Sequence, residues 1–561
     1  MPEIVTRERD PAAFEALITA GVDPRLARIY AARGVSGAAD LNHAFSALLA
    51  PCQLAHIDRA ATMLADAIQA GKRLLIVADY DADGATACAV GMRALSAMGA
   101  KIKFLVPNRF EYGYGLTPEI VALAAEGRPH IIITVDNGIA SVEGVAEANR
   151  RGIAVLVTDH HLPGQSLPDA AVIVNPNQAG DVFASKHLAG VGVIFYTMLA
   201  LRAVLRERNH FATRPEPNLA DLLDLVALGT VADVVRLDHN NRVLVEQGLK
   251  RIRAGKVSPG IRALMLIAGR DAARATTYDM GFVVGPRLNA AGRLDDMSLG
   301  IECLLASDER VALELATKLD QMNRERRSIE SGMKDEAFAT LDTVDVGNRY
   351  SLALFDANWH QGVVGILASR IREKYHRPVI AFARDKNGEL KGSGRSIRGF
   401  HMRDALDLVT KREPQLIAKF GGHAMAAGLT IAEAAMPDFT AAFEAAARSM
   451  LTPADLADRI ETDGALGANE IDFAFVNSLD AQVWGQGFAA PSFTGHFRVA
   501  EQRVVGERHL KLKVVLGGIE YEAMRFGSAD ALNTSIDAVF RPSINEFRGS
   551  KTLQLVLDHV A

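Results

Sequence analysis

The stretch RLLIVADYDADGATA, residues 73 to 87, decides the fold of the first half of this chain. An apolar run follows Arg73, and Asp79, Asp81 and Asp83 come next at alternate positions. In an extended segment, this spacing directs three carboxylates to the same side of the backbone. The stretch therefore predicts a buried strand whose carboxyl end carries an acidic cluster, ahead of a helix over 85 to 98.

Three more apolar runs alternate with helical patterns after this strand. KIKFLV (101 to 106), HIIITV (130 to 135) and IAVLVT (153 to 158) are the expected strands, and helices are expected over 117 to 126 and 141 to 150. Buried parallel strands are continuous Val, Ile and Leu runs, and the six-residue length and β-branched content argue against core helices. The alternation predicts an α/β domain built on a parallel sheet.

The rest of the chain changes character twice. From about 305 to 342 it becomes charged and helical, with Gly332 as its only glycine, and a second α/β pattern then runs from YSLALF (350 to 355) to a helix near 436 to 450. After Pro453, short alternating segments predict a small β-barrel. We therefore divide the chain into an N-terminal helical preamble (1–50), a first α/β domain (51–304), a long connecting helix (305–342), a second α/β domain (343–453) and a barrel (454–561).

The composition is that of a globular protein with several cores. The chain has 561 residues, of which 49% are hydrophobic and 23% charged. Its net charge of −5 argues against a protein that coats nucleic acid through a broad positive surface, although a local groove is compatible with it. Cys52, Cys88 and Cys303 lack Cys-x-x-Cys spacing, so we expect three reduced thiols. With no leader pattern and no apolar run near ~20 residues, we expect a cytoplasmic protein.

Acidic and histidine side chains follow the ends of the predicted strands. ITVDNG ends the third strand with Asp136, and LVTDHH ends the fourth with Asp159, His160 and His161. ALGTVADVV later supplies Asp233 after an apolar helix. Open α/β sheets bind their ligands at the carboxyl ends of their strands. These side chains together with the first aspartates therefore predict a metal site.

Each motif has a simpler interpretation when it is taken alone. Asp83 can cap a helix, and Asp-x-Asp-x-Asp-Gly also begins a calcium loop, but Val90 stands where such a loop needs glutamate. The combination of several strand ends favours metal binding. Carboxylates with imidazole suit manganese or magnesium, and the absence of cysteine ligands disfavours structural zinc. Two such ions that share a carboxylate predict phosphoester hydrolysis.

These residues, in this order, resemble the DHH phosphoesterase superfamily, named for the triplet at 159 to 161. The resemblance implies two divalent cations, Mn²⁺ or Mg²⁺. It implies that Asp159 orients an imidazole and that His161 faces the scissile phosphate. The implied ligands are Asp81 for one ion, Asp83, His160 and Asp233 for the other, Asp136 as the bridge, and Asp79 either as a ligand or as a support behind the ligands.

The second α/β domain resembles the DHHA1 substrate-binding domain of the same superfamily. GSGRS (392 to 396) and GGHAMAAG (421 to 428) carry this resemblance. Their glycines let backbone N–H groups approach phosphate oxygens, although a tight turn is the usual meaning of such a motif. NWHQGVVGILASR (358 to 370) places His360 beside a helix start, where capping is the alternative. The substrate-binding candidates of this domain are Gln361, Ser393, Arg395, Ser396 and His423.

The chain is most similar to the branch of single-strand-specific 5′→3′ DNA exonucleases, whose C-terminal domain is an OB-fold. VPNRFEYGYGL (106 to 116) supplies Arg109, and GPRLNAAGRLDD (285 to 296) supplies Arg287, Asn289 and Arg293. Arginines beside an acidic site can clamp a 5′-phosphate, and ion pairs are their alternative role. The basic candidates of the barrel, which solvated strand faces would also explain, are Arg503, Arg508, Lys511, Lys513 and Arg548.

The resemblance implies an enzyme of DNA recombination and repair. We expect a single strand to thread between the two α/β domains and to be released as 5′-mononucleotides, with single-strand-binding protein and a RecQ-type helicase as partners of a monomeric enzyme. The alternatives are a DHH phosphodiesterase of small substrates, such as an oligonucleotide or a cyclic dinucleotide, and a non-catalytic replication scaffold. A small substrate needs no long channel or OB-fold, and a scaffold should have lost ligands that this chain keeps.

Overall fold

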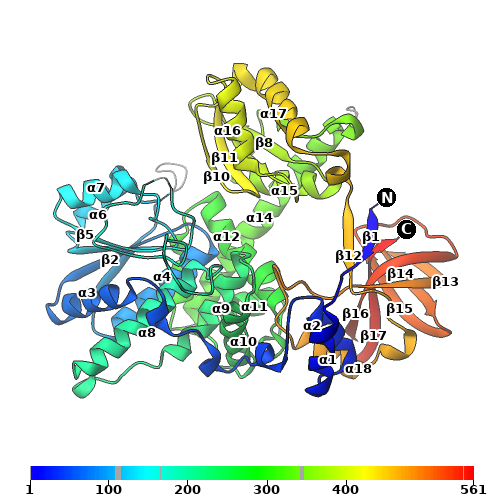
Figure 1. Ribbon diagram of the computed structural model, residues 1–561, viewed down its shortest axis with the longest axis horizontal. Coiled ribbons are helices and arrows are strands. Elements are labelled where there is room, and N and C mark those ends of the chain that lie inside the picture. The colour runs from blue at the N-terminus through cyan, green and yellow to red at the C-terminus, as the bar shows by residue number, and fades with distance from the viewer. Residues whose placement is uncertain (1, 108–114, 165, 342–345, 548, 561) are drawn as a thin grey trace. The chain divides into compact units, whose positions relative to one another are not determined.

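The computed structural model describes residues 2–107, 115–164, 166–341, 346–547 and 549–560 (Figure 1). The chain forms two compact units. One contains Met1–Val5 and Met322–Glu461, and the other contains Thr6–Gln321 and Thr462–Ala561. Within the described ranges, no helix combines the length and the apolar content needed to cross a membrane.

The larger unit is built on a five-stranded parallel sheet, so the predicted sheet is confirmed. Its order is β3-β2-β4-β5-β6, and each neighbouring pair is parallel. The last strand was not predicted, because three residues are too few to show a pattern. The strands are β2 (Arg73–Ala78), β3 (Lys101–Leu105), β4 (Ile131–Val135), β5 (Ala154–Thr158) and β6 (Val172–Val174).

Helices cover both faces of this sheet, which leaves only the strand ends open to ligands. Val77, Ile132 and Val155 share one core with Ile120 and Val145 from the helices on one face. The buried strand residues explain the continuous apolar runs in the sequence. The surrounding helices are α3 (Ile57–Gln69), α4 (Ala82–Ala97), α6 (Pro118–Glu126), α7 (Val142–Arg150) and α8 (Gly190–Glu207).

A group of helices completes the first α/β domain. The last of them is the predicted long helix, α14 (Glu309–Leu341). A π-helical segment, Asp279–Val284, runs directly into α12. The others are α9 (Leu223–Ala232), α10 (His239–Arg253), α11 (Pro259–Ile267), α12 (Gly285–Leu294) and α13 (Ser298–Leu305).

The C-terminal segment forms a closed five-stranded barrel in the order β13-β14-β15-β17-β16, as predicted (Figure 1). Of the two N-terminal helices, α2 packs against this barrel, since Ile29 belongs to the same core as Phe493, Phe497 and Phe540, and α1 packs against α2. Residues before 50 thus contribute to the barrel domain. The elements are α1 (Pro11–Thr19), α2 (Pro24–Ala31), α18 (Phe473–Asp480), β13 (Phe493–Val505), β14 (His509–Leu516), β15 (Ile519–Phe526), β16 (Ser535–Phe547) and β17 (Ser550–Val560).

The smaller unit contains the second α/β domain, a mixed sheet in the order β10-β11-β9-β8-β7. Its GSGRS motif lies at the end of a strand, where a Cβ on Gly392 would come within 2.4 Å of Phe382. This glycine therefore serves packing. The elements are β7 (Leu352–Phe355), α15 (Val364–Tyr375), β8 (Val379–Arg384), β9 (Glu389–Arg395), α16 (Met402–Arg412), β10 (Lys419–Gly422), β11 (Ala426–Ala432) and α17 (Met436–Met450), and β1 (Glu3–Thr6) pairs with β12 (Arg459–Thr462).

Candidate functional site

The first three aspartates mark the passage from β2 into α4. Asp79 follows the strand directly, and Asp81 is the N-cap of the helix, accepting a hydrogen bond from the Gly84 N–H at 3.0 Å. Asp83 lies in the first helical turn. The expected extended arrangement of all three is therefore wrong, because an aspartate at the cap starts the helix at Ala82.

Asp83 is fully buried at the amino end of α8. Its two carboxylate oxygens accept hydrogen bonds from the backbone N–H groups of Gly190 at 2.7 Å and Val191 at 2.9 Å. The helix start stabilises the anion. Burial and the nearby charge of Asp233 nevertheless raise the pKa of Asp83 to about 7. A divalent cation at this point would relieve both effects.

Asp233 reaches the same place from the end of α9. A Cβ on Gly229, one turn earlier, would lie 2.1 Å from Thr86 Oγ1 and 2.9 Å from Asp83 Oδ1, so glycine is required for the close approach of α9 to α4. Burial and the charge of Asp81 raise the pKa of Asp233 to about 7. This role of Gly229 was not predicted, because a close approach of two helices leaves no pattern in the sequence.

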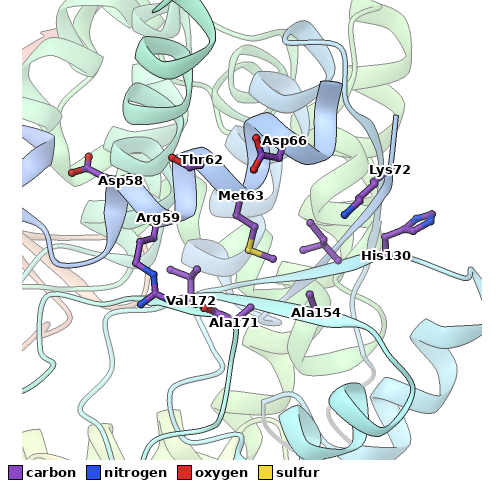
Figure 2. A pocket seen from close by; sticks show the side chains of 11 residues that line it. Asp58, Arg59, Thr62, Met63, Asp66, Lys72, His130, Ala154, Ala171 and Val172 are labelled. Atoms are coloured by element: carbon purple, nitrogen blue, oxygen red, sulfur yellow. Dashed lines mark hydrogen bonds between the residues drawn. The ribbon is translucent and has the colours of Figure 1, made fainter. Parts of the chain in front are cut away.

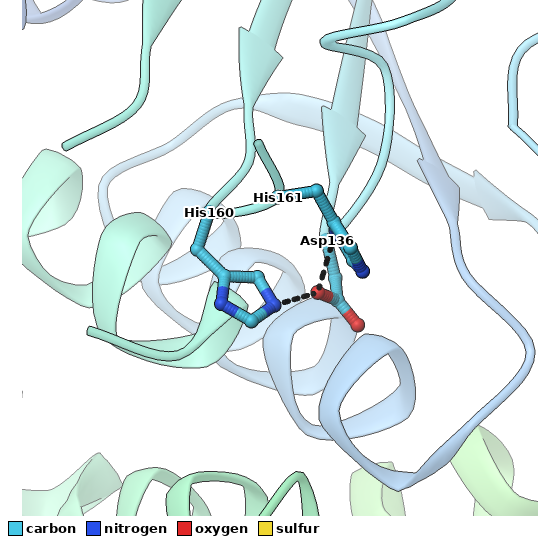
Figure 3. A group of neighbouring side chains, drawn as sticks. All are labelled: Asp136, His160 and His161. Carbon is cyan, nitrogen blue, oxygen red and sulfur yellow. Dashed lines mark ion pairs between the residues drawn. The ribbon is translucent and has the colours of Figure 1, made fainter. Parts of the chain in front are cut away.

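Asp136 stands at the centre of the cluster. It follows β4 with a φ of 62°, a left-handed conformation that is strained for a non-glycine residue. Its Oδ1 lies 3.1 Å from Nε2 of His160 and 3.9 Å from Nδ1 of His161 (Figure 3). Burial and the charge of Asp83 raise the pKa of Asp136 well above its ordinary value. The fold thus forces a carboxylate into acidic surroundings.

Asp159 organises the histidine pair. Its Oδ1 accepts hydrogen bonds from the backbone N–H groups of His160 at 2.7 Å and His161 at 3.1 Å, and it lies 2.8 Å from Nδ1 of His161. Burial lowers the pKa of His161, but the hydrogen bond with Asp159 and the charges of Asp159, Asp233 and Asp79 together outweigh it and raise the pKa to about 9. Burial and the charge of His161 lower the pKa of His160, which favours the neutral form that binds metals.

The side chains form three overlapping groups of possible metal ligands. Within each group, the ligand atoms all lie within 4.8 Å of one another. Two groups share Asp136 and two share His160. Apart from each other, Asp136 Oδ1 and His160 Nε2 have no hydrogen-bond partner among the described residues, although both are buried. Unsatisfied buried ligand atoms fit a metal centre. The groups are Asp79–Asp81–Asp136, Asp83–His160–Asp233 and Asp136–His160–His161.

Two asparagines that the sequence analysis did not single out support the histidines. Asn177 Nδ2 donates to the carbonyl of His160 at 2.6 Å, and Asn175 Nδ2 donates to that of His161 at 2.9 Å. Both follow β6 in the sequence VNPN, residues 174 to 177. Their position after a further strand could have indicated this role. A strand of three residues is too short to be recognised in the sequence, so they were missed.

The arginine-rich motif near 287 is engaged within the protein. Arg287 is buried, and its guanidinium pairs with Asp320 of α14 at 2.8 Å, which fits the alternative of an ion pair. Asn289 Oδ1 accepts the Ala82 N–H at 2.8 Å and so holds the loop between β2 and α4. Arg109 lies outside the described residues. A role for any of them in substrate binding stays a prediction.

In the smaller unit, Ser393 and Arg395 lie together on one face of β9. Arg395 Nη1 donates to Ser393 Oγ at 3.2 Å and to the Gly394 carbonyl at 2.7 Å, and no ion pair of this arginine occurs among the described residues. Burial and the charge of Arg372 lower its pKa. A half-buried guanidinium without a carboxylate partner can serve as an anion-binding group.

The other substrate-binding candidates of the smaller unit make different contacts. Ser396 is fully buried and donates to the Phe400 carbonyl at 2.6 Å, so it does not join Ser393 and Arg395. His423 is exposed in the turn between β10 and β11, and the adjacent Met425 carbonyl accepts the Ser396 N–H at 2.9 Å. Gln361 donates to the Arg384 carbonyl at 3.0 Å.

Of the five predicted basic residues of the barrel, two form ion pairs, two are exposed, and one lies outside the described residues. Lys511 pairs with Glu522 at 2.8 Å and Lys513 pairs with Glu501 at 3.1 Å, which fits the alternative of solvated strand faces. Arg503 and Arg508 are exposed. Arg548 lies outside the described residues.

A hollow of about 590 Å³ lies at the opposite ends of the strands (Figure 2). Ile131, Ala154 and Val172 line it, and each is the first residue of its strand. The acidic cluster follows the last residues of β2, β4 and β5. This hollow is therefore separate from the candidate metal centre.

Three family models match the chain in succession. The N-terminal domain of the DHH family matches residues 73–230, the DHHA1 domain matches 347–449, and the RecJ OB domain matches 462–559. Together they match each of the three predicted folded domains. The matches follow the parallel sheet, the mixed sheet and the barrel described above.

Full-length relatives and solved structures agree with these domains. The chain is 49% identical to a single-stranded-DNA-specific exonuclease RecJ of Dickeya dadantii, over 99% of both chains. It is 48% identical to the RecJ of Escherichia coli, over 97% of this chain and 96% of the relative. The structure of Thermus thermophilus RecJ in complex with Mn²⁺ matches all of this chain and 79% of that one, with a TM-score of 0.83 and 30% identity. The chain belongs to the RecJ family of metal-dependent, single-stranded-DNA-specific exonucleases.

Proposed function

We propose that this chain degrades single-stranded DNA from its 5′ end and releases 5′-mononucleotides by two-metal hydrolysis. One observation carries the chemistry: two ligand groups share Asp136 and two share His160 at the carboxyl ends of the parallel strands. A shared carboxylate is what two neighbouring cations require. The crowded carboxylates and unsatisfied buried ligand atoms support the same site.

The ligands are divided between two positions in this proposal. Asp79, Asp81 and Asp136 hold one cation, and Asp83, His160 and Asp233 hold the other, with Asp136 as the bridge. Mn²⁺ or Mg²⁺ at these positions supplies Lewis acidity and activates a water molecule. The imidazolium of His161, oriented by Asp159, stabilises negative charge on the scissile phosphate.

The smaller unit supplies one proposed substrate contact. Arg395 and Ser393 bind a backbone phosphate, because the half-buried guanidinium has no carboxylate partner among the described residues. We keep Arg109 as a clamp for the 5′-phosphate. The remaining candidates for the substrate are Arg287, Asn289, Gln361, Ser396 and His423; the internal hydrogen bonds of Ser396 and the ion pair of Arg287 give these two a structural role as well.

We extend the proposal to partners and location. Single-strand-binding protein and a RecQ-type helicase would deliver single strands to a monomeric enzyme in the cytoplasm, and family membership is the support for this step. Adding either purified protein should raise the rate of degradation of a partly duplex substrate. An unchanged rate with both proteins would remove them as functional partners.

Labelled DNA tests the polarity and strand specificity. We expect Mn²⁺ or Mg²⁺ to support rapid release of the terminal mononucleotide from 5′-labelled single strands, with slow loss from 3′-labelled strands and from blunt duplexes. EDTA should stop the reaction, because the carboxylates alone provide no Lewis acid. If mononucleotides leave first from the 3′ end, the proposed polarity is wrong.

A further inference from the structure

Two aromatic rings project from the helical run that leads to the metal centre. Tyr278 is 55% exposed and Phe282 is 66% exposed, although their rings stack with centroids 5.1 Å apart and planes inclined by 23°. Tyr278 directly precedes the π-helical segment and Phe282 lies within it. The segment packs against α11, where Leu266 is 65% exposed. Exposed apolar groups of this kind usually mark a binding surface.

The position of this aromatic pair is set by glycines that bring its helix to the site. A Cβ on Gly281 would lie 3.2 Å from Val231, and one on Gly285 would lie 3.1 Å from the Cβ of Ala232, the residue before Asp233. The same helical run then reaches Asn289, which holds the loop of the first aspartates. At ~1.5 Å per residue, the two rings lie about 10 and 16 Å along the run from Asn289.

Three arginines lie near the rings, and each pairs with a carboxylate. Arg270 Cζ lies 5.9 Å from the centroid of the Tyr278 ring and pairs with Asp279 at 3.3 Å, and Arg541 on β16 interacts with Tyr278 and pairs with Asp558 at 2.6 Å. Arg274 pairs with Glu546 of β16 at 2.6 Å, so the barrel adjoins this segment within the larger unit. Aromatic faces beside arginines suit unpaired bases and the phosphates that join them.

We propose that Tyr278 and Phe282 form a stacking platform for unpaired bases at about the third to fifth nucleotides from the 5′ end. This number follows from the distances along the helix at ~3.4 Å per stacked nucleotide. The inference rests on the proposed 5′→3′ activity. A single strand is favoured over a protein as the occupant because the platform lies on the helical run that reaches the catalytic site, and because the adjoining barrel matches the RecJ OB domain.

Substrate length separates this role from a general effect on catalysis. The variant Tyr278→Leu/Phe282→Leu keeps the apolar area and loses both rings, whereas Tyr278→Phe/Phe282→Tyr keeps them. With Mn²⁺, the leucine variant should lose about tenfold or more in kcat/KM on a strand of about twelve nucleotides, and less than about twofold on a dinucleotide, which is too short to reach the rings. The aromatic variant and a control, Phe45→Leu at another exposed phenylalanine, should behave as the wild type.

Several results would overturn the platform. These are an equal loss on both lengths, an unchanged rate of the leucine variant on both, or a loss in the aromatic variant. The unchanged rate would assign the rings to a protein partner. A wild type that degrades neither strand from its 5′ end would instead defeat the proposed function itself.

A measurement on the wild type keeps the test independent of variant folding. In EDTA, where strands remain intact, the fluorescent base 2-aminopurine is placed at the fourth or the eleventh nucleotide of the longer strand. Binding should quench the fourth position more strongly, because aromatic stacking quenches this base. Equal quenching at both positions would contradict a platform at this distance.

Discussion

The two candidate sites of the molecule carry opposite charges, and each is incomplete without a ligand. In the larger unit, Asp83, Asp136 and Asp233 are crowded together and have raised pKa values. In the smaller unit, Arg395 is half-buried with no carboxylate partner among the described residues, and its pKa is lowered. The first site attracts cations and the second attracts anions.

This difference shows how one enzyme divides the recognition of a phosphodiester. Uncompensated buried charge is unfavourable for folding, so its retention at two places indicates a ligand at each. Cations neutralise the carboxylates beside the reacting phosphate. A phosphate elsewhere on the strand neutralises the arginine. Changes at the first site should therefore affect the chemical step, and changes at the second should affect binding.

The largest effect should come from Asp136→Asn. The amide keeps the shape but cannot bridge two cations, so kcat on single-stranded DNA should fall by at least ~10³-fold with KM little changed. Steady-state kinetics with Mn²⁺ measure this. Asp169→Asn is the matched control, since Asp169 is exposed and outside the cluster. A wild-type kcat in Asp136→Asn would contradict the assigned bridge.

Arg395→Gln should change KM rather than kcat, which is the opposite of Asp136→Asn. Loss of a charged hydrogen bond of ~1.5–3 kcal/mol should raise KM by roughly 10- to 100-fold and leave kcat within about threefold. Arg384→Gln is the control, because the guanidinium of Arg384 already forms an exposed ion pair with Glu433 and lies over the ring of Phe355. An effect confined to kcat would place Arg395 in the chemistry and remove the contrast between the sites.

The metal-free protein should respond to pH through the acidic cluster. Asp83 and Asp233 have folded pKa values raised to about 7, so their stabilising contribution is present at low pH and is lost as pH rises through that value. Mn²⁺ binds their ionised forms. The rise in Tm on adding Mn²⁺ should therefore be larger at about pH 8 than at about pH 6. Thermal melting checks this, and a rise that is independent of pH would contradict it.

The smallest expected effects come from the two serines of the GSGRS motif, Ser393 and Ser396. Ser393→Ala should weaken DNA binding by roughly two- to tenfold, because its hydroxyl lies on the face of Arg395. Ser396→Ala should leave binding unchanged and lower the free energy of unfolding by about 1 kcal/mol, because its hydroxyl is bonded internally. Binding titrations and denaturant melts separate the two. A binding loss in Ser396→Ala would place both hydroxyls at the substrate.

Much of the fold was predictable because its strands are buried on both faces. The runs at 73–78 and 130–135 are apolar throughout, and the structure has β2 at Arg73–Ala78 and β4 at Ile131–Val135. The three-residue β6 and strand β16 were missed. The first is too short to show a period, and the second contains Pro542, which argues against a strand.

The residues of the site were predictable, but their local geometry was not. Strand ends indicated Asp136 and His160, whereas the capping by Asp81 and the position of Asp83 in a helix depend on where α4 begins. The alternation of polar residues in GSGRS does not show which face of β9 is buried, so Ser396 was grouped with Ser393. Tyr278 and Phe282 were missed because exposure is a property of packing.

The stoichiometry of bound Mn²⁺ tests the central claim most directly. Calorimetric titration of the wild type and of Asp136→Asn, in parallel with cleavage of 5′-labelled single strands, relates the ligands to the reaction. The proposed division of the ligands between Asp79–Asp81–Asp136 and Asp83–His160–Asp233, with Asp136 as the bridge, predicts two bound ions per wild-type chain, and at most one in the variant together with loss of cleavage. Two ions and full cleavage in Asp136→Asn would contradict the shared metal centre.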